Sequence, residues 1–93
     1  MRILPLLLIV ALVVPLLAQN THEDDRIYDQ VRLKLADDVN VKGGGIEVIV
    51  KNGTVTLRGR IHDEHARSKA EKIAKKVKGV VGVINELKLP SAD

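Results

Sequence analysis

The side chains best suited to hold a metal ion are two histidines, His62 and His65, which lie three positions apart. A catalytic zinc site needs three protein ligands, and the chain has no cysteine to complete one. The absence of cysteine also excludes a disulfide and a thiolate nucleophile. The sequence therefore predicts two solvated histidines at the start of a helix, with no metal and no other cofactor.

Adjacent carboxylates, Asp24-Asp25 and Asp37-Asp38, are the candidates for general acid–base chemistry. Neighbouring helix positions point about 100° apart, so neither pair can act on one substrate atom, and charge at helix ends explains both. The run Gly43–Gly45 is no phosphate loop, because no Lys-Ser or Lys-Thr pair follows it. The sequence indicates no positioned base for Ser68 or Ser91. We therefore predict no catalytic residues, and that the protein is not an enzyme.

Positive charge is the most informative feature of the chain. Residues 51–88 contain ten basic residues against four acidic ones, and six of the ten lie in the segment 67–78. The apolar side of that segment must face the protein interior, so its cations must face water. These cations either form a surface that only contacts solvent or provide a contact for anionic lipid. Each cation near an anionic lipid surface contributes about 1 kcal/mol at low salt. The candidate lipid-binding residues are Arg67, Lys69, Lys72, Lys75 and Lys76. Nucleic acid is not expected as a partner, because Tyr28 is the only aromatic residue and bases need a row of them for stacking.

The first 18 residues predict export. Met1-Arg2 supplies a positive start, residues 3–17 are all apolar or proline, and Ala18 is a small residue suited to cleavage. A helix that spans a bilayer needs about 20 apolar residues, so a retained anchor is the less favoured alternative. We expect a periplasmic protein that can also associate with the membrane. Its parts should be a signal peptide over residues 1–18, a polar leader over 19–24, a folded domain over 25–89 and a tail over 90–93.

The elements that must position these side chains begin with a helix over about residues 22–36. Thr21–Asp24 fits an N-terminal capping pattern, and Leu33 should be exposed because it lies off the apolar side. The buried side should consist of Ile27, Tyr28, Val31 and Leu35. We expect Gly43–Gly45 to form a flexible loop. A hairpin follows, since residues 46–51 and 55–60 alternate in polarity around Asn52-Gly53, a turn in which both residues take positive φ.

A second helix should start after Asp63 as its N-cap and stop at Gly79 as its C-cap. Its buried stripe should consist of Ala66, Ala70, Ile73, Ala74 and Val77. A third strand over residues 80–89 contains Asn85, whose amide should bind neighbouring backbone, while Gly59 in the second strand indicates a close backbone approach or a bulge. The order predicts an α+β fold, an αββαβ sandwich with two helices on one face of a three-stranded mixed sheet, the third strand parallel to the second.

The hairpin segment 46–59, Ala70 and Ala74 on the second helix, and the segment 79–87 together resemble the BON domain family. The resemblance covers about Asp25–Leu89. It implies the αββαβ fold, a place in the bacterial cell envelope, phospholipid binding, and a role in envelope maintenance or stress tolerance. BON domains often occur in tandem, whereas this chain carries one copy.

The expected function is therefore that of an exported, non-enzymatic envelope protein that binds anionic phospholipid surfaces. The alternative is a periplasmic protein–protein interaction module, whose partner would contact the acidic first helix or add a strand to a sheet edge. Ionic strength distinguishes the two, because contact through exposed cations weakens with salt and strand addition does not.

Overall fold

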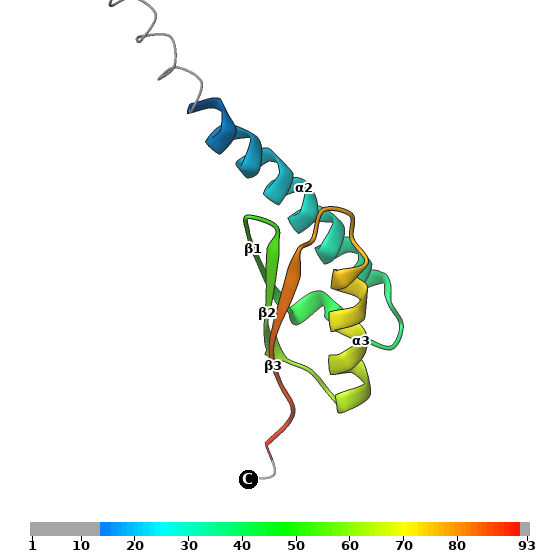
Figure 1. Cartoon of the computed structure of the whole chain (residues 1–93). Coiled ribbons are helices and arrows are strands. Elements are labelled where there is room, and N and C mark those ends of the chain that lie inside the picture. Colours follow the sequence, from blue (N-terminus) through cyan, green and yellow to red (C-terminus); the bar gives the residue numbers. More distant parts are fainter. Residues whose placement is uncertain (1–13, 92–93) are drawn as a thin grey trace, which may run out of the picture.

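The computed structural model describes residues 14–91, with side chains described from His22 onward. Its elements, in chain order, are α2 (Val14–Asp37), the 3₁₀ helix η1 (Gly43–Gly45), β1 (Glu47–Lys51), β2 (Thr54–Arg60), α3 (Glu64–Lys75) and β3 (Gly82–Lys88). Figure 1 shows the three strands as one layer with α2 and α3 on the same side of it. The predicted α+β fold with the order αββαβ is confirmed.

The sheet has the strand order β1-β2-β3, with β1 antiparallel and β3 parallel to β2, as predicted. Side chains alternate between the two faces of each strand. Val55 and Leu57 of β2 are completely buried under the helices, whereas Arg58 and Arg60 are exposed. Because no helix within residues 14–91 covers the second face, β2 presents these arginines on an open sheet surface.

The hairpin turn between β1 and β2 has the predicted conformation, with φ of 51° at Asn52 and 81° at Gly53. The carboxylate of Asp24 accepts hydrogen bonds from both turn amides, at 2.8 Å from the Asn52 N–H and 2.9 Å from the Gly53 N–H. Helix-end charge is therefore the wrong interpretation of Asp24, which lies inside α2 and attaches this helix to the hairpin tip (Figure 1).

Helix α2 starts at Val14 and not at residue 22. Leu, Ala and Gln in residues 16–19 are strong helix formers, which favours helix upstream of the predicted start. The predicted cap is wrong, because Thr21 lies inside α2 and the carboxylate of Asp24, three positions on, binds the hairpin turn instead. The proposed cleavage position after residue 18 lies within this helix, and residues 1–13 lie outside the described residues.

The apolar side of α2 is buried as predicted at Ile27, Val31 and Leu35. Tyr28 was expected on the same side but is 36% exposed. It lies at the margin of the apolar stripe, where the guanidinium of Arg32 stands 5.6 Å from its ring centroid. The margin of an amphipathic stripe therefore faces solvent.

Helix α3 starts as predicted, since Asp63 Oδ1 accepts a hydrogen bond from the Ala66 N–H at 2.8 Å. Its end differs from the prediction, because the helix stops at Lys75 and Gly79 lies beyond the C-cap. Val77 leaves the helix and enters the core, with 5% of its surface exposed. Gly79 instead takes φ of 97° in the turn that leads to β3. Within the predicted stripe the three alanines are buried, but Ile73 is only partly covered.

The glycine run Gly43–Gly45 forms η1, where a flexible loop was expected. Its backbone packs tightly on both sides. A Cβ added at Gly43 would lie 2.8 Å from Leu35 Cβ, and one added at Gly59 would lie 3.1 Å from the carbonyl oxygen of Gly45. The close backbone approach predicted at Gly59 is thus confirmed, and its neighbour is η1.

Candidate functional site

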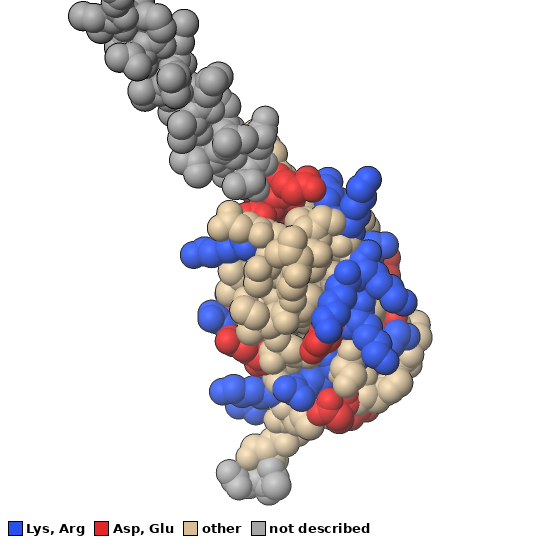
Figure 2. Space-filling model, in the orientation of Figure 1, with Lys and Arg blue, Asp and Glu red and all other residues tan. Residues whose placement is uncertain are grey.

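The basic side chains of α3 lie on the side of the helix away from the sheet. Figure 2 shows them as a band along this helix, with acidic side chains at its margins. Ala66, Ala70 and Ala74 on the opposite side are completely buried. The structure therefore gathers the predicted cations on one surface, the α3 basic surface, which consists of Arg67, Lys69, Lys72, Lys75 and Lys76.

Arg67 is held by contacts within the folded domain, so its guanidinium is less available at the surface than the lysines are. Its Nε donates to the carbonyl oxygen of Leu87 at 3.0 Å, and its Nη1 lies 3.2 Å from Glu64. Asn85 accepts a hydrogen bond from the Leu87 N–H at 3.1 Å and donates to the Arg67 carbonyl at 3.0 Å, so its predicted backbone contact is confirmed. Both backbone groups of Leu87 are occupied, which closes the edge of β3 at this residue to an added strand.

Lys69 and Lys75 have acidic partners. Lys69 Nζ lies 3.3 Å from Asp38, and Lys75 Nζ lies 3.0 Å from Glu71. The pKa of Glu71 is lowered, first by the hydrogen bond from Lys75 and then by one from Asn85. Burial raises the pKa of Asp38, but backbone hydrogen bonds and Lys69 together leave it below its ordinary value. Two of the predicted contact residues are thus already partly neutralised.

Lys72 and Lys76 remain unpaired with any carboxylate of the described residues. Both are exposed. Lys76 lines a shallow hollow between α2 and α3 together with Lys34, Asp37, Asp38 and the partly covered Ile73. The hollow thus adds two carboxylates and a small apolar contact beside the unpaired lysines.

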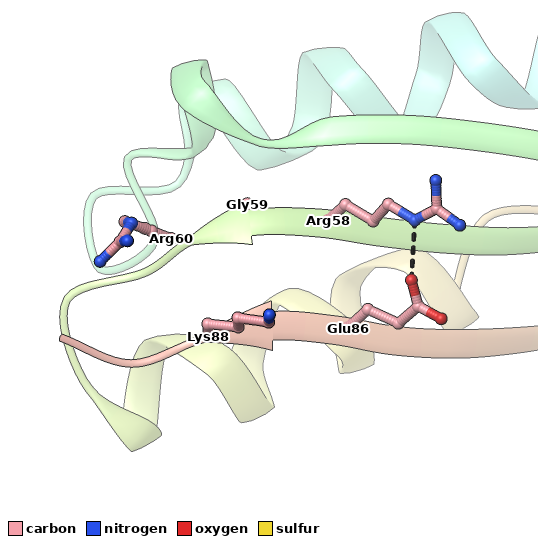
Figure 3. Close-up of a pocket in the computed structure, with 5 residues that line it drawn as sticks. All are labelled: Arg58, Gly59, Arg60, Glu86 and Lys88. Carbon is pink, nitrogen blue, oxygen red and sulfur yellow. Dashed lines mark hydrogen bonds and ion pairs between the residues drawn. The ribbon is translucent and has the colours of Figure 1, made fainter. Parts of the chain in front are cut away.

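A second basic surface lies on the open face of the sheet, where no site was predicted from the sequence. A hollow of about 760 Å³ is lined by Arg58, Gly59, Arg60, Glu86 and Lys88. Arg58 Nε donates to Glu86 Oε1 at 2.7 Å across β2 and β3, and this bond raises the pKa of Arg58 (Figure 3). Arg60 lies in register with Lys88 two positions further along. The alternation of charged residues near the ends of both strands was the only sequence signal for this surface.

The remaining chemical candidates form no site. His62 Nε2 lies 3.9 Å from Asp63, and nowhere in residues 14–91 do three His, Cys, Asp or Glu side chains gather closely enough to hold a metal ion. Asp38 accepts a hydrogen bond from the Asn40 N–H at 2.9 Å and thereby shapes the turn after α2. The Asp38 carboxylate therefore has a structural role in this turn.

Together these features define a small αββαβ domain with basic surfaces on its helical side and on its open sheet face. A comparison with protein-family models matches residues 23–91 to the BON domain, and the chain belongs to this family. BON domains form a non-catalytic family associated with membrane or phospholipid binding and with envelope stress. A comparison with curated proteins finds no match. Within residues 14–91, no helix combines the length and apolarity needed to cross a bilayer.

Proposed function

We propose that this chain is an exported envelope protein whose BON domain binds anionic phospholipid surfaces through α3, in support of envelope maintenance or stress tolerance. The observation that carries the proposal is the pair of unpaired, exposed lysines, Lys72 and Lys76, on a helix whose other side is packed on the sheet. Membership of the BON family supports the same kind of ligand.

The other α3 cations can join the contact at small cost. Exposed ion pairs contribute about 0.2–1 kcal/mol, so Lys69 and Lys75 can exchange their carboxylate partners for lipid phosphates. Arg67 is held by β3 and contributes mainly to the local potential. Ile73, partly covered beside Lys76, adds a shallow apolar contact at the margin of the surface.

Export and a periplasmic location belong to this proposal. They are supported by the apolar run over residues 3–17 and the small residue Ala18. The core residues that the structure describes lie between Ile27 and Leu87, so a chain that begins at Gln19 contains all of these.

Vesicle co-sedimentation tests the lipid contact. Vesicles that contain phosphatidylglycerol or cardiolipin should bind the protein at low salt, and neutral phosphatidylcholine vesicles measure any contribution of the apolar N-terminal segment. Replacing both Lys72 and Lys76 with Gln should weaken binding by about 2 kcal/mol, roughly thirtyfold. The matched control, Lys42→Gln with Lys51→Gln, changes the net charge equally away from α3.

The lipid proposal is refuted if the protein sediments equally with anionic and neutral vesicles while circular dichroism shows that it is folded. A partner retained at high salt would then favour the protein-interaction alternative, because screening weakens contact through exposed cations but not strand addition. Equal losses in the α3 variant and its control would show that α3 is not the contact surface.

A further inference from the structure

The hollow on the open sheet face carries an excess of positive charge. Three cations line it, Arg58, Arg60 and Lys88, against the single carboxylate of Glu86. Glu86 is already engaged with Arg58 at 2.7 Å. No carboxylate in the described part of the chain pairs with the other two cations. The hollow therefore has two positive charges that the protein does not neutralise.

The two unneutralised cations oppose each other. Arg60 and Lys88 are register partners on parallel strands, and like charges at directly opposite positions destabilise a sheet. Figure 3 shows their charged ends pointing away from each other. Arg60 also lines a neighbouring hollow with Lys42, which adds another cation to this end of the domain. A bound anion would convert this repulsion into attraction.

We propose that Arg60 and Lys88 form a binding site for the dianionic phosphate of a phosphate monoester. The guanidinium of Arg60 can donate two parallel hydrogen bonds to phosphate oxygens, and Lys88 supplies a point charge across the strand pair. A phosphate monoester carries about −1.5 to −2 charges at neutral pH, which matches the excess of two. The exposed backbone at Gly59 forms the floor of the hollow between the arginines. This site is separate from the α3 basic surface.

Inorganic phosphate is the first probe, titrated into ¹⁵N-labelled protein and followed by amide chemical shifts. The Ile61 N–H is a suitable reporter because it donates to the Lys88 carbonyl at 2.9 Å and so joins the two strand ends. Phosphate should shift this amide and its neighbours more than chloride does at equal ionic strength. Arg60→Gln and Lys88→Gln should each weaken phosphate binding about fivefold. Lys51→Gln, an exposed cation elsewhere on the hairpin, is the matched control and should change binding less than twofold.

The site is refuted if chloride reproduces the shifts at equal ionic strength, or if both variants bind phosphate as the wild type does. Vesicles identify the source of the phosphate. A lipid source requires that Arg60→Gln weaken binding to vesicles of phosphatidic acid, a monoester, more than to phosphatidylglycerol, a diester. Loss of inorganic phosphate binding with unchanged vesicle binding supports the site with a soluble phosphate ester as its ligand. Variants at Lys72 and Lys76 leave this site intact, so its failure and that of the α3 contact are distinguishable.

Discussion

Replacing Asp24 with Ala should detach α2 from the hairpin tip. The wild-type carboxylate accepts two backbone hydrogen bonds at 2.8 and 2.9 Å, from residues that are 28 and 29 positions further along the chain. Asn52 is exposed, so its amide can bind water in the variant and the lost bond should cost about 0.5–1 kcal/mol, whereas Gly53 is buried and the loss of its bond should cost about 1 kcal/mol. The sum is about 1–2 kcal/mol. A domain of this size has roughly 3–5 kcal/mol of net stability, so the loss is a large share of it.

The neighbouring residue supplies the control. Asp25 is exposed and makes no hydrogen bond or ion pair within the described chain, yet its replacement by Ala changes charge and helix propensity as Asp24→Ala does. Asp25→Ala should therefore alter stability by at most about 0.5 kcal/mol. Asp24→Asn should fall between the two, because an amide side chain has one acceptor oxygen where the carboxylate has two.

Urea denaturation followed by circular dichroism measures the effect. With a denaturant slope of about 1 kcal/mol per molar, Asp24→Ala should lower the midpoint by about 1–2 M relative to Asp25→Ala. Equal midpoints for the two alanine variants would refute the reasoning, since they would show that the hydrogen bonds to the turn contribute nothing to folding.

Other expected outcomes concern the turn, acid stability and processing. Gly53→Val should cost about 2 kcal/mol in the same assay, because φ is 81° there and a Cβ would lie 3.1 Å from the Gly79 carbonyl oxygen; an unchanged midpoint would contradict this reading of the turn. The Glu71 carboxylate has a lowered pKa, so its contribution to stability is present above the ordinary value of 4.5 and is lost as pH falls through the lowered pKa. Glu71→Gln should therefore lower Tm at pH 7 and leave it nearly unchanged at about pH 3, and an equal Tm difference at both pH values would argue against the ion pair. N-terminal sequencing of protein from the envelope fraction should find Gln19 first, and an intact Met1 would instead indicate a retained anchor.

Local patterns in the sequence were sufficient to predict the elements and their order. The alternation around Asn52-Gly53, the cap at Asp63 and the alanine spacing on α3 each depend on residues within one or two turns of chain. Such interactions form in the same way wherever the segment lies in the fold. The family was therefore recognisable, and the sheet topology followed from the order of the elements.

Element ends were predicted less well, because tertiary packing competes with local signals there. Gly79 has the residue type of a C-cap, but α3 ends at Lys75 and Gly79 takes φ of 97° in the turn that leads to β3. Asp24 lies three positions after Thr21, as a capping pattern requires, yet its carboxylate binds the amides of the distant hairpin turn. Arg26 Nη2 likewise donates to the Lys78 carbonyl at 2.6 Å. That carbonyl is distant in sequence, so no local pattern contains the contact.

For the candidate sites, the sequence alone determined which cations lie on the exposed side of α3, because helical periodicity separates them from the buried alanines. Only the tertiary structure decided which of them are free. It gives Lys69 and Arg67 partners from other elements and leaves Lys72 and Lys76 without one among the described residues. The pairing of Arg60 with Lys88 likewise depends on the register between two strands that are separated by a helix. Packing of the helices on the whole sheet sets this register, so charges far apart in the sequence meet only in the folded protein.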